Sequence, residues 1–338
     1  MALIWIDGFE GYGTSGSVAN ASLQYRYPDS SASNLYIAAG RVSGYCWNSA
    51  YINWSFITPA LTIDPTLIVG CAFYFLQTNA FGAISFVDNA TAGINVTFNP
   101  TVPSTVVLKR GSTTLSTTTL ASTLLTNTWY YVEVKSFCHD TSGAVEVRIN
   151  GATVVSISGI DTKNGADAFC DRVRIYLEYG YIDDYYICDG TGTSLNNFQG
   201  VCNVVGIFPK ADTATVQWAP STGSTHYNLV DENPPNAATD YVSTSTQANT
   251  DLYEYPTLVG SGTILGLQVN STVALSAGVS IVFEAPIVSN GVTELGPDTV
   301  LSSSSYGDVR HISTIDPNTG QPWTIAGLGS ALIGVRVM

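Results

Sequence analysis

Alternating apolar and polar residues mark several short segments of this chain. The clearest are residues 129–135 (Trp-Tyr-Tyr-Val-Glu-Val-Lys), 143–151 and 181–188. Successive side chains of a β-strand point to opposite faces, so this alternation predicts strands with one buried face. The residues that share the buried face are Val132, Val134, Val145, Val147 and Ile149, and those that point away are Glu133, Glu146 and Arg148.

Strand signals of this kind recur along the whole chain, separated by Gly, Pro, Asn and Ser, and no long helical periodicity interrupts them. Asn150-Gly151 predicts a type I′ hairpin, because that turn needs two residues that tolerate positive φ. Residues 67–76 are almost wholly apolar, which is typical of a strand covered on both sides, by a curved sandwich or by a partner chain. The predicted fold class is all-β with antiparallel sheets. Other predicted strands are 35–42, 51–57, 83–87, 105–109, 213–218, 265–269, 280–283, 309–315 and 332–337.

A turn-rich segment at residues 190–197 separates two groups of predicted strands. We therefore predict one domain at residues 1–190 and a second β-rich domain at 191–338. Residues 231–255 contain two adjacent prolines and many small polar residues, which favours an ordered excursion or loop. Near the end of the chain, Gly320 is predicted to occupy a turn and Trp323 to fill a core.

Two resemblances follow from these segments. The three alternating segments resemble the closing sheet of a concanavalin A-like, laminin G-like jelly roll. Over nearly the whole chain, residues 182–192 (Ile-Asp-Asp-Tyr-Tyr-Ile-Cys-Asp-Gly-Thr-Gly), 230–232 with 240–242, and 316–324 are similar, in this order, to virion proteins of tailed bacteriophages. The resemblance implies two antiparallel β-sandwich domains, the first a concanavalin A-like jelly roll. It also implies an accessory role at the head, neck or tail.

Charged residues are scarce in this chain. They make up 11% of its 338 residues, against roughly a quarter in ordinary soluble proteins, while 45% are hydrophobic. Either neighbouring subunits cover much of the surface, which predicts a homo-oligomer, or Ser and Thr coat it. The net charge of −14, with only 12 Lys and Arg, argues against nucleic acid and anionic membranes as partners. No apolar run is long enough to span a bilayer and no signal peptide is visible, so we expect synthesis in a host cytoplasm.

The cysteines do not have the spacing of a zinc site, and we predict neither a metal nor a cofactor. Each cysteine is either a small buried apolar residue or half of a disulfide that forms in an oxidising medium. The candidates for pairing are Cys46, Cys71, Cys138, Cys170, Cys188 and Cys202.

The candidate catalytic motifs in the sequence lack the structural context that their chemistry requires. Residues 11–16 spell Gly-x-Gly-x-x-Gly, but no amphipathic helix follows, so a flexible loop is predicted. Asp183 and Asp184 form the nearest acidic pair. Adjacent strand residues point to opposite faces, so these two carboxylates are predicted to hydrogen-bond at the sheet rim and not to act as a glycosidase pair. The sequence contains no Gly-x-Ser-x-Gly nucleophile elbow with which a histidine could form a catalytic pair. The sequence therefore predicts no enzyme.

Carbohydrate binding is the alternative function. Sugar sites stack sugar rings on exposed aromatic side chains beside amides and carboxylates, and this chain has 19 Tyr and 6 Trp. The candidate residues are Trp47, Tyr51, Asn53, Tyr179 and Tyr181. Strand packing and subunit contacts explain such aromatics equally well. Calcium would need a run of carboxylate ligands, and none is evident in the sequence.

The main prediction is a non-enzymatic virion protein of a tailed phage that acts through contacts with capsid, neck or tail proteins. The alternative is an adhesin that recognises glycans on a host surface. The sequence does not indicate the position on the particle, the copy number or the pairing of the cysteines.

Overall fold

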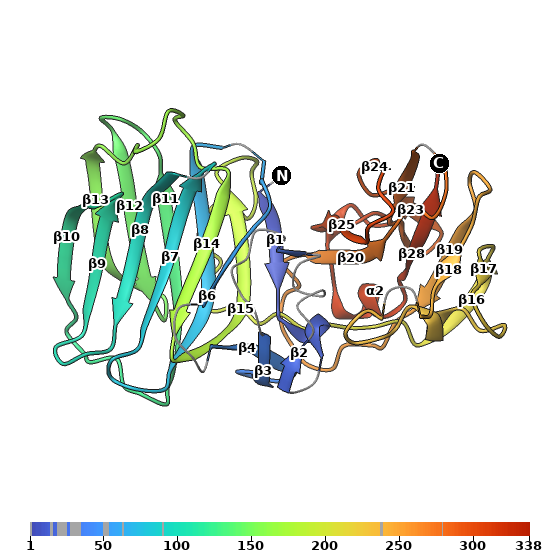
Figure 1. Cartoon of the computed structure of the whole chain (residues 1–338), viewed down its shortest axis with the longest axis horizontal. Helices are drawn as coiled ribbons and strands as arrows, with labels where there is room; N and C mark the ends of the chain where they lie inside the picture. The colour runs from blue at the N-terminus through green and yellow to red at the C-terminus, as the bar shows by residue number, and fades with distance from the viewer. Residues whose placement is uncertain are drawn as a thin grey trace. The chain divides into compact units, whose positions relative to one another are not determined.

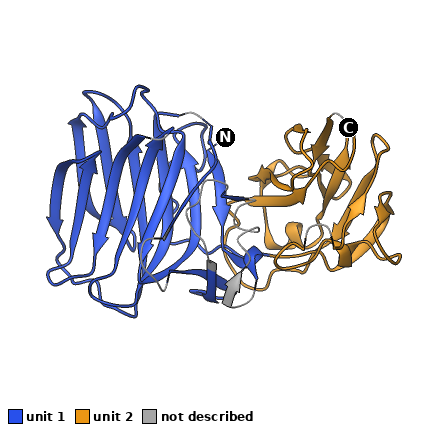
Figure 2. Ribbon diagram, viewed as in Figure 1, with its two compact units in different colours: residues 1–206 blue, residues 207–338 orange. Residues whose placement is uncertain are grey.

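The computed structural model describes residues 2–13, 16–18, 26–27, 35–49, 54–62, 64–89, 91–236, 239–278 and 280–338. The chain divides into two compact units, Met1–Gly206 and Ile207–Met338 (Figure 2). This boundary lies after Gly206, whereas the sequence placed it at residue 190. Residues 190–206 stay with unit 1 because their backbone amides bind side chains on one of its sheets.

Unit 1 is a jelly-roll sandwich of two antiparallel sheets, as predicted (Figure 1). Sheet A has nine strands, in the spatial order β13 (Ala152–Ile160), β12 (Gly143–Ile149), β11 (Trp129–Phe137), β6 (Thr66–Phe75), β15 (Gly180–Asp189), β4 (Tyr45–Ser49), β3 (Leu35–Ala39) and β2 (Gly16–Val18), with β1 (Leu3–Asp7) paired to β15. Sheet B has six, in the order β10 (Thr113–Thr119), β9 (Thr105–Arg110), β8 (Thr91–Asn99), β7 (Phe81–Asp88), β14 (Arg172–Glu178) and β5 (Trp54–Ile57). A 3-10 turn, Glu10–Tyr12, follows β1.

The predicted alternation is confirmed in β11 and β12. The five residues assigned to the buried face all lie in the core between the sheets, namely Val132, Val134, Val145, Val147 and Ile149. The hairpin that joins β12 to β13 has φ values of 50° at Asn150 and 80° at Gly151, as a type I′ turn requires. Local sequence chemistry therefore sets both the register and the turn of this hairpin.

Aromatic rings fill one end of the core of unit 1. The Phe56 ring has its centroid 4.7 Å from that of Tyr27, 4.9 Å from that of Trp47 and 5.6 Å from that of Tyr185. All four rings are inaccessible to solvent. Truncating one such ring to alanine typically costs about 3–5 kcal/mol, so this cluster contributes much of the stability of unit 1.

The apolar strand β6 is covered on both faces by its own chain. Val69, Cys71 and Phe73 point into the core. On the outer face, Gly70 lies directly under the ring of Tyr186, and a Cβ atom built on Gly70 would be 2.1 Å from Tyr186 Cε1. A side chain larger than hydrogen therefore does not fit at residue 70.

Unit 2 is also antiparallel β. Its seven-stranded sheet has the order β16 (Ala211–Val216), β19 (Thr250–Glu254), β28 (Leu332–Val337), β21 (Ile281–Glu284) and β24 (Thr299–Leu301), with β22 (Ile287–Ser289) paired to β28 and to β23 (Val292–Glu294). Three two-stranded sheets are β17 (Ala219–Pro220) with β18 (Val242–Ser243), β20 (Leu267–Val273) with β25 (Gly307–Ser313), and β26 (Ile315–Asp316) with β27 (Gln321–Pro322). The 3-10 turn Tyr227–Leu229 and helix α2 (Ile325–Gly329) complete this unit.

Two features of unit 2 bear on the predictions. Trp323 is 2% exposed and lies in a core cluster with Ile287 and Ile333, which confirms its predicted place. Gly320 has a φ of 66° and occupies the predicted turn. The prediction of a loop over 231–255 is wrong at its end, because β19 pairs with both β16 and β28 inside the main sheet. Long-range pairing outweighed the polar composition there.

Candidate functional site

The covering segment, residues 190–206, lies on the outer face of sheet A. The backbone N–H of Gln199 donates to the Tyr186 hydroxyl at 3.1 Å, and that of Gly200 donates to Glu133 Oε1 at 2.8 Å. The Arg148 guanidinium lies 4.1 Å from the centroid of the Phe198 ring. Glu133 points away from the core as predicted, yet it is only 1% exposed. The covering segment thus buries the middle of a face that the strand pattern alone leaves open.

Asp183 and Asp184 bind the same arginine, which corrects the prediction that they point to opposite faces. Arg41 N donates to Asp183 Oδ2 and Arg41 Nε donates to Asp184 Oδ2, each at 2.6 Å. The cause is a β-bulge between Asp183 and Tyr186, in which Asp184 has a φ of 53°. Val204 N also donates to Asp184 Oδ1 at 2.7 Å. The predicted hydrogen bonding is confirmed and holds the covering segment to the sheet. The predicted place at the sheet rim is wrong, because both carboxylates are only 1% exposed on the interior strand β15.

Glu10 is a buried carboxyl beside this pair. A Cβ atom built on Gly8, Gly44 or Gly206 would come within 2.3–2.7 Å of an atom of the Glu10 side chain, so these glycines make room for it. Burial, together with the charges of the nearby aspartates, raises the pKa of Glu10 to about 9. Burial also raises the pKa of Asp183 to about 7. The covered part of sheet A therefore holds Glu10 as a neutral acid at neutral pH.

The aromatic row lies on the same outer face, at the end of sheet A where β6, β11 and β15 begin or end. Cross-strand register places Trp129 opposite Tyr74, and Tyr74 opposite Tyr181. The same register places Asn48 opposite Tyr181 and Tyr36 opposite Asn48. Cross-strand partners share a face, so we define the aromatic row as Trp129, Tyr74, Tyr181, Asn48 and Tyr36.

Three rings of the aromatic row, those of Trp129, Tyr74 and Tyr181, are in contact and partly exposed. Tyr74 and Tyr181 stack with centroids 5.1 Å apart and planes 16° apart, and Trp129 lies 5.2 Å from Tyr74 at a tilt of 56°. All five side chains of the row are partly exposed. Among the residues that the structure describes, none hydrogen-bonds to Asn48 Oδ1, which is covered. An amide with an unmet acceptor therefore stands between two tyrosines.

The five predicted sugar-binding residues have different positions. Tyr181 joins the aromatic row. Tyr179 is partly buried against the core, with a φ of 53°. The prediction for Trp47 is wrong, because its ring is wholly buried against Phe56 and offers no face to a ligand. Tyr51 and Asn53 lie outside the described residues.

The sequence did not identify most residues of the aromatic row as a binding site. Tyr74 lies in an apolar run that is typical of a strand covered on both faces, and Trp129 has no feature that distinguishes it from other strand residues. Alternation within each strand does place Trp129 on the same face as Glu133, opposite the valines. The information that was missing is the register between β11, β6, β15 and β4, which joins residues up to 133 positions apart, from Asn48 to Tyr181.

The six cysteines that were candidates for disulfides are all free thiols in the structure. Cys202 is partly exposed, and the other five are buried. Within the described residues, no group of three or more His, Cys, Asp or Glu side chains is placed to hold a metal ion. In the same part of the chain, no helix is long and apolar enough to cross a membrane.

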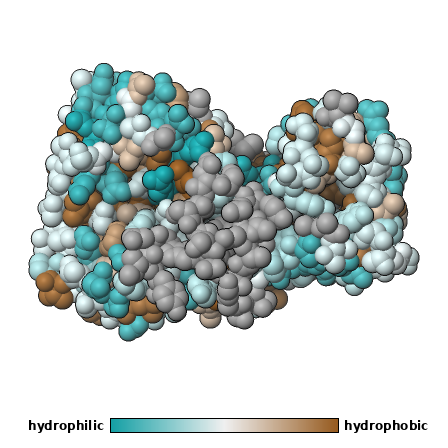
Figure 3. Space-filling view, in the orientation of Figure 1, coloured by the Kyte–Doolittle hydropathy of each residue, from teal (hydrophilic) through white to brown (hydrophobic). Residues whose placement is uncertain are grey.

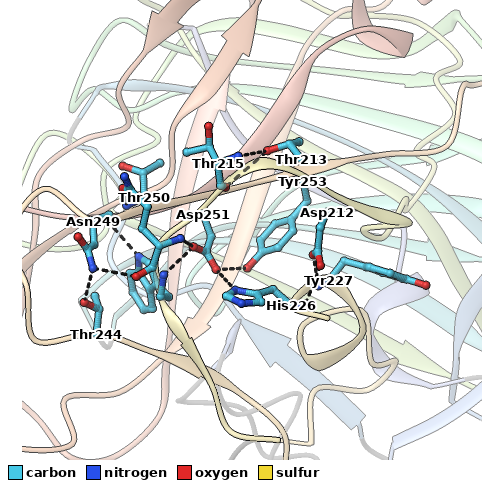
Figure 4. Close-up of polar contacts among 12 residues, drawn as sticks. Asp212, Thr213, Thr215, His226, Tyr227, Thr244, Asn249, Thr250, Asp251 and Tyr253 are labelled. Atoms are coloured by element: carbon cyan, nitrogen blue, oxygen red, sulfur yellow. Dashed lines mark hydrogen bonds and ion pairs between the residues drawn. The ribbon is translucent and has the colours of Figure 1, made fainter. Parts of the chain in front are cut away.

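Unit 2 holds a buried polar cluster around Asp251 (Figure 4). Asp251 Oδ2 lies 2.7 Å from His226 Nδ1 and accepts from the Tyr253 hydroxyl at 3.1 Å. Asp251 Oδ1 accepts from the backbone N–H groups of Gln217 and Trp218. Every oxygen of this carboxylate is thus occupied by the local fold, as expected of a structural anchor that fixes the turn after β16 to β19.

A shallow hollow of about 370 Å³ in unit 2 is separate from this anchor. Leu252, Val288, Leu295 and Arg336 are among the residues that line it. Leu252 lies on β19 next to Asp251, and consecutive strand residues point to opposite faces, so the hollow and the Asp251 cluster lie on different sides of the sheet. Arg336 Nη1 donates to Glu284 Oε2 at 2.9 Å. In the described part of unit 2, the Asp251–His226 pair therefore does not line this hollow.

The surface of the described residues carries scattered apolar side chains. Figure 3 shows hydrophobic residues interspersed with hydrophilic ones over the face in view. Large exposed hydrophobic side chains occur in both units, among them Val102, Leu125, Val201 and Val259. This distribution does not decide between a surface covered by neighbouring subunits and one coated by Ser and Thr, so the predicted homo-oligomer stays a prediction.

Part of this chain is similar to solved structures. No protein-family model and no curated protein matches this chain. Among solved structures, the alginate lyase Aly36B is 13% identical, with 55% of this chain and 96% of that chain covered and a TM-score of 0.38. The carbohydrate-binding module CBM66 from Bacillus subtilis is 10% identical (46% and 92% covered, TM-score 0.32), and the galectin LEC-6 of Caenorhabditis elegans is 9% identical (42% and 94% covered, TM-score 0.30). At these identities and TM-scores, the matches decide nothing about what this chain binds or catalyses.

Proposed function

We propose that unit 1 is a carbohydrate-binding module and that the aromatic row is its binding site. The observation that carries the proposal is the order of side chains across β6, β15, β4 and β3, namely Tyr74, Tyr181, Asn48 and Tyr36. A short amide between two aromatic rings, on one face of a sheet, combines the two contacts that a sugar ring needs. These contacts are an apolar surface for its C–H groups and a hydrogen-bonding group for its hydroxyls.

The stacking in the row determines which ring faces a ligand can use. One face of Tyr181 is taken by Tyr74, on β6. Its other face is turned toward β4, where the Asn48 side chain is shorter than a tyrosine. Neighbouring strands are about 4.8 Å apart, so β15 and β3 are separated by about 10 Å. A flat ring needs roughly 3.5–4 Å to each neighbour, and this span admits one sugar ring above Asn48.

Asn48 supplies the polar contact in this proposal. Its acceptor is buried without a partner, a state that typically costs about 1–3 kcal/mol. Rotation of the amide about its last torsion exchanges the oxygen with the nitrogen, so a sugar hydroxyl can meet either atom. The Tyr181 hydroxyl, on the neighbouring strand, adds a second polar group.

The experiment is a screen of the whole chain on a glycan array, followed by titration calorimetry with the best oligosaccharide. We expect Tyr181→Ala to weaken binding about tenfold, which corresponds to the loss of one ring contact of about 1.4 kcal/mol. Asn48→Ala should weaken it similarly. A wild-type chain that binds no glycan on the array would refute the proposal.

Tyr176→Ala is the matched control. Tyr176 stacks on Phe81 with centroids 4.9 Å apart and planes 16° apart, so it is a tyrosine in an equivalent ring pair on sheet B. Both substitutions remove one partner of a surface ring stack, and their effects on stability should be similar. Equal losses of glycan affinity in the two variants would show that the aromatic row is not the binding site.

We further propose that binding occurs without turnover, as the sequence predicts. The nearest carboxylates in the covered part of the sheet, Asp183 and Asp184, are committed to Arg41 and to backbone amides. Release of reducing or unsaturated sugar from the bound oligosaccharide would contradict this. The virion role stays a prediction, because no feature of the described residues tests it.

A further inference from the structure

Cys138 and Cys170, which come from opposite sheets of unit 1, lie against two consecutive residues, Asp64 and Pro65. Cys138 follows β11 of sheet A, and its backbone N–H donates to the Pro65 carbonyl at 2.7 Å. Cys170 precedes β14 of sheet B and forms an antiparallel bridge with Asp64. Because Asp64 and Pro65 are consecutive, both cysteines are held against the same short stretch that leads into β6.

The two side chains lie in the same shielded part of unit 1. Each residue is 6% exposed, and both belong to the core cluster between the sheets. A hydrogen bond with the Cys170 side chain lowers the pKa of Cys138, which favours the Cys138 thiolate. A disulfide bond would hold the two sulfurs 2.03–2.05 Å apart.

We propose that Cys138 and Cys170 form a disulfide bond in an oxidising medium, whereas Cys46, Cys71 and Cys188 remain thiols. The contacts of these three cysteines explain the difference. Cys46 Sγ donates to the Ala39 carbonyl, and Cys71 points into the core from the middle of β6. Cys188 is fully buried in β15. Cys202, on the covering segment, donates to the Gln199 carbonyl instead.

The bond can form by exchange with a small disulfide such as oxidised glutathione. The Cys138 thiolate attacks one sulfur of glutathione disulfide, which gives a mixed disulfide and releases one glutathione thiolate. Cys170 loses its proton to solvent and attacks the Cys138 sulfur, which releases the second glutathione. Two protein thiols are oxidised and one glutathione disulfide is reduced. Cys138 directly follows the last residue of β11. Local opening of this strand end therefore gives glutathione disulfide access to the Cys138 thiolate.

This disulfide would join the two sheets directly. The closed loop contains β12, β13 and residues 161–170, which contact the end of sheet B through Asn164 Nδ2 to the Ala92 carbonyl and Asp167 N to Asp88 Oδ2. Closing a loop of this size restricts the unfolded chain and raises the melting temperature by about 10 °C. The inference does not depend on carbohydrate binding.

The test is a map of the cysteines in the whole chain before and after incubation with oxidised glutathione. Remaining thiols are alkylated under denaturing conditions, and peptides are identified by mass spectrometry without reduction. We expect a cross-linked peptide pair that contains Cys138 and Cys170, with Cys46, Cys71 and Cys188 alkylated. Full alkylation of Cys138 and Cys170, or a bond from either to another cysteine, would overturn the proposal.

Two variants sharpen the test. In Cys170→Ser the resolving thiol is absent, so Cys138 should retain glutathione as a mixed disulfide. Cys46→Ser is the control, because serine can donate to the Ala39 carbonyl as Cys46 does, and it should leave the cross-link unchanged. A Cys170→Ser chain that acquires no glutathione at Cys138 would show that Cys138 is not the attacking thiol. Should that variant fail to fold, the map of the unsubstituted chain still decides the proposal.

Discussion

The outer face of sheet A has a covered middle and an open end, and the two are built from different residues. In the middle, Glu133, Asp183 and Asp184 lie under the covering segment, and each carboxylate accepts hydrogen bonds at 2.6–2.8 Å. At the end, Tyr74, Trp129 and Tyr181 are partly exposed and mainly contact one another. The same strands β6, β11 and β15 contribute to both regions.

The difference shows that burial changes which interactions a side chain must make. A carboxylate removed from water must be matched by an arginine or by several N–H groups, or else become neutral as Glu10 does. In this region Asp183, Asp184 and one oxygen of Glu133 are already hydrogen-bonded within the chain. Aromatic rings need no partner at the surface, so the open end keeps free faces and one unmet amide. The comparison can be tested by substitutions in each region.

The largest effect is expected for Arg41→Met. This change leaves Asp184 buried without its guanidinium partner, whereas the Arg41 backbone N–H that binds Asp183 is kept. Breaking a buried ion pair typically costs about 3–5 kcal/mol. Urea unfolding should show the loss as a lower midpoint. Arg148→Met is the control on the same face. It removes an ion pair with Glu146 that is about a third exposed and the contact with the Phe198 ring, which together should contribute less than about 2 kcal/mol. Equal losses in the two variants would mean that the middle of the face is not desolvated.

The next effect concerns pH and Glu10. Burial raises its pKa from 4.5 to about 9, so the folded chain keeps the proton while the unfolded chain releases it. The stabilisation is complete below pH 4.5 and is lost as pH rises toward 9. The free energy of unfolding should fall by about 1 kcal/mol per pH unit within this window. Glu10→Gln should remove this part of the slope in unfolding curves measured between pH 5 and pH 8. An unchanged slope would place the titration on another group.

A smaller effect is expected for Glu133→Gln. The Glu133 carboxylate accepts from the Tyr186 hydroxyl at 2.6 Å and from Gly200 N at 2.8 Å. Replacing these charged hydrogen bonds by neutral ones should cost about 2 kcal/mol. Hydrogen exchange should also become faster at the Gly200 amide, which reports directly on the covering segment. If this amide exchanges at the original rate, Glu133 does not hold the segment in place.

The smallest effect lies in the aromatic row. A double-mutant cycle with Tyr74→Leu and Tyr181→Leu should give a coupling energy of about 1 kcal/mol, as usual for stacked rings. The same cycle on Phe81 and Tyr176 of sheet B provides the reference. A saturating glycan ligand should increase the first coupling and leave the second unchanged. An equal response of the two pairs would contradict the proposed site.

The amino-acid sequence alone is enough to predict the all-β class, the hairpin at Asn150-Gly151 and the buried face of β11 and β12. These features depend on local rules, namely the period of two in a strand and the φ preference of two turn residues. The core position of Trp323 was predicted correctly for a similar reason, because burial in a core is favourable for a large apolar ring within a polar, turn-rich segment.

Long-range packing determines which outer faces are covered and which residues become neighbours. The bulge at Asp184 turned two adjacent carboxylates toward one arginine, and strand alternation alone predicts the opposite. The aromatic row depends on the register of five strands, and Trp47, one residue from Asn48, faces the core instead. A period of two assigns each side chain to one of two faces, but the packing of distant segments determines what lies on each face.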